Sequence, residues 1–207
     1  MEQVTIPFNL TLQQTPGTTP GTAIIKAPIP TVVNAPSRQS VVEITGPTTT
    51  VNIENLTIEG PGSNTMISTD VFVGISVVGG ATANVTGDMI DNITKQMSNG
   101  ETAIGIEVGT NTGQVGHATI TDSIITGYQG SGVRIRGGSS GTITDNMIIG
   151  APGRVPPGPF PFALNGIVID SGGTATITGN TVENNKFLDQ SSGIINLGIS
   201  TITGNHG

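Results

Sequence analysis

A short threonine-rich phrase that recurs four times constrains the fold of this chain more than any other feature. Each copy reads Thr-Ile-Thr, followed by Asp or Gly and then by Ser or Asn. Two looser copies precede them, at Asn84–Asp88 and Asn52–Asn55. The four full copies are residues 119–123, 142–146, 176–180 and 201–205. Self-similarity at a period of about 20–50 residues marks a chain built from stacked units, so the phrase predicts a solenoid.

The spacing of the phrases indicates how one turn of the solenoid is built. The central apolar residues of the six copies are 23 to 35 residues apart, and the longer separations are a minimal turn plus a loop. These residues are Ile53, Val85, Ile120, Ile143, Ile177 and Ile202. Two other phrases alternate with the first, for example Gly132–Ile135 and Met147–Ile149. Apolar residues recur at every second position, which is typical of half-buried strands. Three short strands per turn predict a three-faced coil.

Composition supports an all-β fold with an aliphatic core. The 207 residues include one Tyr, five Phe, no Trp and no Cys, and the apolar residues are mainly Ile and Val. β-branched residues favour strands, whereas Gly and Asn favour the turns between them. The length suits one domain that buries a sizeable core.

This pattern resembles the right-handed parallel β-helix of pectate-lyase-like proteins. The resemblance covers about Val41 to Asn205, and also Val4 to Leu12. It implies a single β-helix domain over residues 1–207 with about seven turns. Two Pro-rich segments interrupt the repeat, and we expect residues 15–50 to form loops on the first turns and residues 151–165 to form an inserted loop. The class includes lyases, hydrolases, adhesins, phage spikes and structural segments, so the fold alone does not specify a function.

A polar residue ends five of the phrases and is expected to stack on its own kind from turn to turn. The five are Asp88, Ser123, Asn146, Asn180 and Asn205. A stacked amide can bond the backbone of a sharp corner and its neighbour in the next turn. Asn55 lies one residue out of this spacing, so a small shift of the chain is expected there.

The threonines of the four full phrases are candidate binding residues. With the Ile between them pointing inward, both Thr of each phrase should point outward, in two parallel files. These residues are Thr119, Thr121, Thr142, Thr144, Thr176, Thr178, Thr201 and Thr203. The arrangement resembles the Thr-x-Thr arrays of β-solenoid ice-binding proteins. The simpler interpretation is a cross-strand Thr ladder, which stabilises a sheet by a few tenths of a kcal/mol.

Four charged residues on the Gly-led strands are weak catalytic candidates. Alignment of the glycines places Glu107 beside Arg134 and Arg136 beside Asp170 in adjacent turns. Resemblance to β-helix lyases would give an Arg the role of base, and resemblance to β-helix hydrolases would require grouped Asp residues. No cluster of Asp residues is visible in the sequence. Exposed cross-strand ion pairs, each contributing about 0–1 kcal/mol, are the simpler interpretation.

The Pro-rich segment 151–165 holds a third set of candidates. Arg154 lies in the same segment as Phe160 and Phe162, two of the five Phe of the chain. Loops carry function more often than the scaffold that supports them. These three residues could therefore form a lip that binds sugar or a partner, or they could cover the side of the coil.

Charge and hydropathy narrow the classes of partner. The net charge is −7 and the seven Lys and Arg are scattered, which disfavours nucleic-acid binding. No apolar stretch approaches the roughly 20 residues that span a bilayer, and the first residues do not form a signal peptide. Hydroxyl- and amide-based polarity favours a mature or trimmed segment outside the cell or on its surface. We expect no metal and no cofactor.

The sequence leads to one main functional hypothesis and two alternatives. Uncapped solenoid ends template further strand pairing, and no capping helix is predicted at either end of the repeat. The main hypothesis is therefore a non-catalytic structural or surface segment that stacks end to end with other copies, or that belongs to a longer fibre or adhesin. The alternatives are a polysaccharide lyase, hydrolase or glycan-binding protein, and an ice-binding protein that uses the Thr array.

Overall fold

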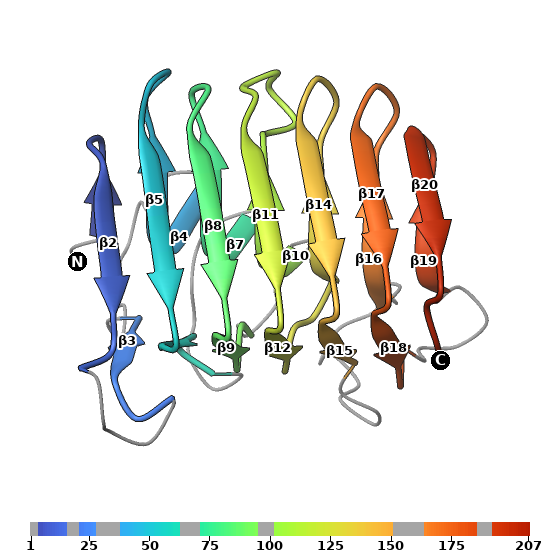
Figure 1. Ribbon diagram of the computed structural model, residues 1–207, viewed down its shortest axis with the longest axis horizontal. Coiled ribbons are helices and arrows are strands. Elements are labelled where there is room, and N and C mark those ends of the chain that lie inside the picture. The colour runs from blue at the N-terminus through green and yellow to red at the C-terminus, as the bar shows by residue number, and fades with distance from the viewer. Residues whose placement is uncertain are drawn as a thin grey trace.

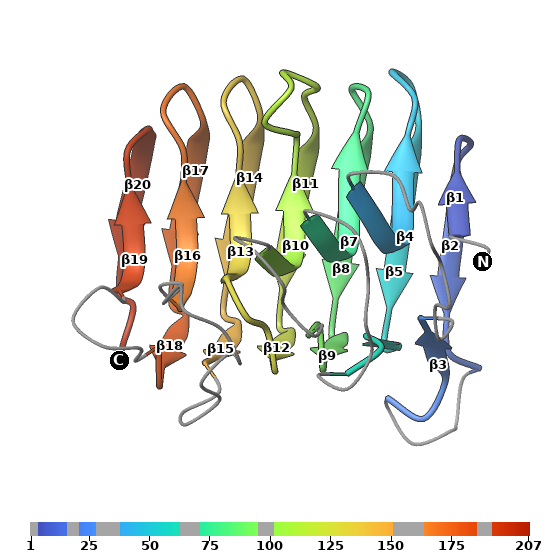
Figure 2. The same cartoon turned by 180° about the vertical axis from the view of Figure 1, so that it is seen from behind.

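In the described part of the chain, twenty short strands wind into a coil of three parallel sheets (Figures 1 and 2). The computed structural model describes residues 4–15, 21–27, 38–62, 71–94, 102–150, 164–185 and 192–207. Every strand pairs in parallel with the equivalent strand of the next turn, so that strands distant in sequence lie side by side. The described residues contain no helix that is long and apolar enough to cross a membrane.

The strands of each sheet follow one another along the coil axis. Sheet A consists of β1 (Val4–Ile6), β4 (Arg38–Thr45), β7 (Val71–Val78), β10 (Thr102–Val108), β13 (Ser131–Ile135), β16 (Asn165–Ile169) and β19 (Ser192–Asn196). Sheet B consists of β2 (Leu10–Gln13), β5 (Thr50–Glu54), β8 (Thr82–Thr86), β11 (His117–Thr121), β14 (Ser140–Thr144), β17 (Thr174–Thr178) and β20 (Ile199–Thr203). Sheet C consists of β3 (Ile24–Lys26), β6 (Thr57–Glu59), β9 (Met89–Asp91), β12 (Ile124–Thr126), β15 (Met147–Ile149) and β18 (Thr181–Glu183).

This arrangement confirms the predicted all-β, three-faced parallel coil. Sheets A and B each contain seven strands and sheet C contains six, which corresponds to seven turns. The Ile of each threonine-rich phrase pairs with its counterpart, as Ile120 does with Val85 on one side and Ile143 on the other. Strands of neighbouring turns lie about 4.8 Å apart, so the register stacks equivalent side chains directly on one another.

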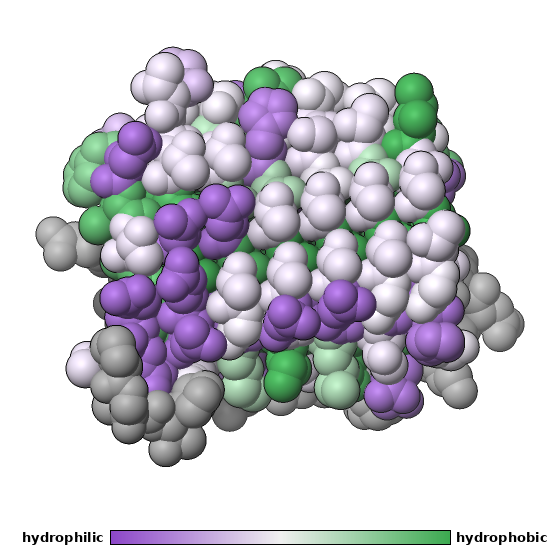
Figure 3. Space-filling view, viewed as in Figure 1, coloured by the Kyte–Doolittle hydropathy of each residue, from purple (hydrophilic) through white to green (hydrophobic). Residues whose placement is uncertain are grey.

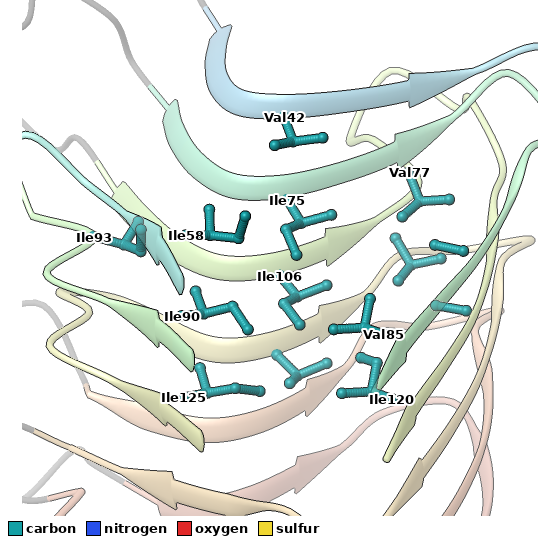
Figure 4. Close-up of a cluster of buried hydrophobic side chains, with 14 of the residues drawn as sticks. Val42, Ile58, Ile75, Val77, Val85, Ile90, Ile93, Ile106, Ile120 and Ile125 are labelled. Atoms are coloured by element: carbon teal, nitrogen blue, oxygen red, sulfur yellow. The ribbon is translucent and has the colours of Figure 1, made fainter. Parts of the chain in front are cut away.

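The core is a set of aliphatic columns that run along the coil (Figure 4). Val42, Ile75 and Ile106 form one column from sheet A, and sheet C supplies another. The middle-turn members of these columns have no exposed surface. Burial of one such side chain contributes about 1.5–3 kcal/mol, which explains why Ile and Val dominate the inward positions.

A left-handed residue lets the chain turn the corner from sheet B to sheet C. The residue directly after each sheet B strand has a positive φ in turns two to seven: Asn55, Gly87, Asp122, Asp145, Gly179 and Gly204, with φ between 51° and 69°. Gly, Asn and Asp are the residues that adopt this conformation at least cost. Asn55 is therefore a regular corner residue. The expected shift at Asn55 is wrong, because β5 and β8 pair residue for residue up to this corner.

The residue after that corner forms the predicted polar ladder. The backbone N–H of Ser123 donates to Oδ1 of Asn146 at 3.0 Å, and the N–H of Asn146 donates to Oδ1 of Asn180 at 2.9 Å. The side-chain amide of Asn146 also donates to the carbonyls of Ile120 and Thr144, at 2.8 and 2.9 Å. Asn146 is 2% exposed, so these bonds satisfy backbone groups that no water reaches.

Two loop predictions need correction. The interval 15–50 contains β3 and the long strand β4, and neither strand contains a proline. The six prolines around these strands concealed them in the sequence pattern. The second predicted loop ends too late, because Asn165 is the first residue of β16. Residues 151–163 lie outside the described part of the chain.

We expect Asn146→Ala to lower the free energy of unfolding by about 2–4 kcal/mol, because it leaves buried backbone groups without partners. The measurement is urea unfolding followed by circular dichroism. Thr142→Ala is the control, since Thr142 is exposed on β14, the strand that precedes Asn146, and its loss should change stability by no more than about 0.5 kcal/mol. Equal effects of the two substitutions would contradict a structural role for the ladder.

Candidate functional site

The eight candidate threonines lie on the outward face of sheet B. The register places them in two files of four, one through Thr119, Thr142, Thr176 and Thr201 and the other through Thr121, Thr144, Thr178 and Thr203. All eight are exposed or half-buried, whereas the Ile between each pair is buried in β11, β14 and β17 and exposed only in β20, the last strand of the sheet. Thr86 extends the second file by one turn, because it pairs with Thr121.

The structure adds a third file that the sequence analysis missed. Thr82, His117, Ser140 and Thr174 occupy the first position of their strands and pair in register. They lie two residues before the threonine-rich phrase, on the same face of the sheet, because side chains alternate along a strand. Outward side chains recur at every second residue, so counting two residues back from the first Thr of each phrase would have found this file.

A shallow hollow of about 400 Å³ lies between the third file and the file of Thr119, Thr142, Thr176 and Thr201. Hydroxyl-bearing side chains line both sides, and the residues between the files are small: Ala118, Gly141, Ala175 and Ser200. The view of this face shows the pale, weakly polar side chains in regular rows across successive turns (Figure 3). The face is therefore flat and periodic from β11 to β20. It is also almost free of formal charge, because His117 is the one titratable residue in β11, β14, β17 and β20.

Few of these hydroxyls are used within the protein. Nδ1 of His117 and Oγ of Ser140 lie 2.7 Å apart, and the hydroxyls of Thr178 and Thr203 lie 3.2 Å apart. The strands of sheet B contain no Phe or Tyr. The single Tyr of the chain, Tyr128, is buried and donates its hydroxyl to Asn185. The face can thus donate and accept hydrogen bonds, but its strands offer no Phe or Tyr ring on which a sugar could stack.

The charged candidates meet on the outward side of sheet A. The predicted register is confirmed, because Glu107 pairs with Arg134 across β10 and β13. The predicted pair of Arg136 and Asp170 is also formed, whereas two other ion pairs run diagonally. Glu107 binds Arg136, and Arg134 binds Asp170 through two hydrogen bonds of 3.1 and 3.0 Å. Arg136 also reaches Asp170 at 3.0 Å and thereby joins the two acids.

A fifth residue that the sequence analysis did not single out completes this network. Arg38, at the start of β4, forms an ion pair with Glu107 and donates to Oγ of Ser76 at 3.1 Å. No repeat position marks it, because Arg38 lies before the Gly-led phrase and reaches its partners through the length of its side chain. The network is therefore Arg38–Glu107–Arg136–Asp170–Arg134, which alternates in sign and carries one net positive charge.

The expectation of exposed ion pairs is wrong for this network. The Glu107 side chain has no exposed surface, Arg136 is 12% exposed and Asp170 is 19% exposed. Burial of a charge costs desolvation free energy, and pairing with opposite charges offsets that cost. Here the arginine guanidinium groups cover the Glu107 carboxylate and supply the opposite charges. Sequence alone could not give this burial, because the residues that cover Glu107 come from other turns.

This network gives little support to acid–base chemistry. Each carboxylate is bound to two arginines, and no carboxylate pair faces a common space as a glycoside hydrolase would need. The described residues also contain no group of three His, Cys, Asp or Glu side chains that could hold a metal ion. The geometry of Glu107, Arg134, Arg136 and Asp170 is that of a structural clamp across the turns. Arg154, Phe160 and Phe162 lie outside the described residues.

The fold and the two faces define the class of this protein as a parallel β-helix. A family model described as a right handed beta helix region matches residues 40–207. The chain therefore belongs to the right-handed β-helix family. Neither a curated protein nor a solved structure matches it.

We expect Glu107→Leu to lower the free energy of unfolding by about 3 kcal/mol, because it removes the ion-pair partner of Arg38 and leaves Arg136 with Asp170 alone. The control is Lys26→Met, which removes the Lys26–Glu59 pair; the Lys26 side chain is 59% exposed, so the loss should stay below about 1 kcal/mol. Urea unfolding of both variants measures the difference. A loss for Glu107→Leu no larger than for Lys26→Met would show that the network is dispensable.

Proposed function

We propose that this chain is a structural segment of an extended β-helical rod outside the cell, and that its first and last turns stack on further β-helical turns. The supporting observation is the contrast between middle and end turns. Among the inward isoleucines of sheet B, Ile202 in the last turn is 42% exposed. Those of the earlier turns are fully buried: Ile53, Ile120, Ile143 and Ile177. Leu197 and Ile199 of the same turn are 65% and 75% exposed.

The two end turns match one another in pattern. Continuing the register of sheet B by one turn would place Ile202 of one coil over Leu12 of the next, and Thr201 over Thr11, because Leu12 and Thr11 occupy the same columns. An apolar column would then continue through the joint, and the free strand edges would pair. The further turns could come from a second copy of the chain or from additional turns of a longer protein.

The network on sheet A supports the structural role. Its ion pairs connect side chains of turns two, four, five and six, which would help a rod to resist bending. Both acids of the network, Glu107 and Asp170, are bound to arginines. A location outside the cell agrees with the low content of charged residues, 10%, and with polarity carried by hydroxyl and amide groups.

The proposal predicts that the purified chain associates end to end. Negative-stain electron microscopy and sedimentation velocity over a range of concentrations should show rods longer than one coil, or filaments of constant width. Ile202→Lys should shorten them, because it places a charge in the apolar joint. The matched control is Ile124→Lys on a middle turn, since Ile124 is 40% exposed and Ile202 is 42% exposed.

Two outcomes would contradict this proposal. Single coils at all concentrations would show that the end turns do not pair with each other. Shortening by Ile124→Lys to the same extent as by Ile202→Lys would show that association uses the sides of the coil.

A second candidate function, ice binding, has support from the hollow on sheet B. The two files of threonines present hydroxyl and methyl groups at a constant repeat, on β-branched side chains that have few rotamers. A partner that is itself a flat lattice with donors and acceptors suits such a face better than one discrete molecule does. A soluble glycan has less support, because the strands of sheet B offer no Phe or Tyr.

Ice binding predicts that the chain produces thermal hysteresis and that Thr142→Tyr abolishes it, since the larger side chain would protrude from the flat face. Thr112→Tyr is the control, because Thr112 is exposed outside sheet B. Absence of thermal hysteresis in the unsubstituted chain would rule out this function. Equal loss in both variants would rule out the Thr files as the binding surface.

A further inference from the structure

One position of the polar ladder carries an acid instead of an amide. Successive turns place Leu56, Asp88, Ser123, Asn146, Asn180 and Asn205 at this position, directly after the left-handed corner residue. Asp88 is 2% exposed. The side chain is therefore enclosed in the same way as Asn146 and Asn180, which are 2% and 0% exposed, but it can carry a charge that an amide cannot.

The hydrogen bonds of Asp88 differ from those of the asparagines in one respect. Its Oδ1 accepts from the N–H of Leu56 at 2.7 Å, as Oδ1 of Asn146 accepts from the N–H of Ser123. Its Oδ2 accepts from the N–H of Thr86 at 3.0 Å. Asn146 instead donates through Nδ2 to two carbonyls, and an ionised carboxylate has no hydrogen to donate. The ladder at Asp88 therefore lacks the donor that the later turns have.

The surroundings of Asp88 disfavour its charged form. Burial raises the pKa of the Asp88 carboxyl from 3.8 to about 6, the N–H groups of Leu56 and Thr86 oppose this shift, and the nearby Glu54 adds to it. Glu54 lies on β5 in the preceding turn, and Ser123 faces Asp88 from the following turn as an uncharged partner. No described Lys, Arg or His forms an ion pair with Asp88. Glu107 contrasts with it, because two arginines compensate the charge of that acid.

We propose that Asp88 makes the coil acid-responsive: uptake of one proton by its carboxylate tightens turns two to four, so that this residue contributes more to stability in mildly acidic than in neutral surroundings. The proton converts the carboxylate into a carboxylic acid, removes an uncompensated buried charge and supplies the missing donor. By the equivalence of the turns, the carbonyls of Ile53 and Thr86 correspond to the two that Asn146 uses. The inference is independent of end-to-end stacking and of ice binding.

The direction of the pH effect follows from linkage. The folded state binds this proton more tightly than the unfolded state, whose carboxyl has the ordinary pKa of 3.8. Stability from Asp88 is therefore fully present below the unfolded pKa and is lost as the pH rises through about 6. Most surface carboxylates of folded proteins have the opposite effect, since acid usually destabilises the native state.

The test is thermal unfolding of the full chain between pH 4 and pH 8, compared with Asp88→Asn. Asn supplies the amide of the later turns without a titrating group. The ratio of the two unfolding equilibrium constants should change by roughly 10- to 100-fold between pH 8 and pH 4, with the unsubstituted chain gaining stability relative to Asp88→Asn as the pH falls. Asp145→Asn is the control, because Asp145 is an exposed acid at a corner where Asn is also tolerated.

A second measurement keeps the proposal testable if the variant does not fold. Carbon-13 NMR of the unsubstituted chain follows the Asp88 carboxyl directly, and its titration midpoint should lie well above the ordinary value of 3.8. An Asp88 midpoint at or below 4 would overturn the proposal. So would an unchanged pH profile in Asp88→Asn, or an equal change in Asp145→Asn.

Discussion

Residue-for-residue parallel pairing between successive turns is the constraint on which this structure depends. Each strand pairs with the equivalent strand one turn away, so every position of the repeat becomes a column along the coil. The nearest neighbours of a side chain are then its own equivalents, about 4.8 Å above and below. A column can persist only if its residue type tolerates stacking on itself, and aliphatic groups, amides and hydroxyls all do. Like charges do not, because their repulsion adds to the cost of burial.

The two buried acids show how the coil deals with charges that interrupt a column. Glu107 stands on sheet A between the uncharged Ser76 and the basic Arg134, and diagonal arginines compensate its charge. Asp88 stands between Leu56 and Ser123 in its column, and the hydrogen bonds to its carboxylate come from the backbone N–H groups of Leu56 and Thr86. The first acid clamps several turns together. The second is an uncompensated charge whose cost depends on pH.

Sequence reasoning reached the features that follow from the repeat and missed those that do not. The outward Thr files, the Asn ladder and the adjacency of Glu107 and Arg134 all follow from aligning equivalent phrases. Arg38 could not be found in this way, because it lies outside the phrases and reaches Glu107 diagonally across the turns. Strand β4 was obscured for a related reason: prolines flank an otherwise regular strand and dominate the local composition.

The sequence by itself determined the fold class, the number of strands per turn, the register and the direction in which most side chains point. All of these depend on the repeat, and its period can be recognised directly from the amino-acid sequence. Only the tertiary structure decided which charges pair, that Glu107 and Asp88 are fully enclosed, and that a hollow lies between two files of hydroxyls on sheet B. These properties depend on which side chains from different turns are long enough to contact one another, and the period of the repeat does not specify those contacts.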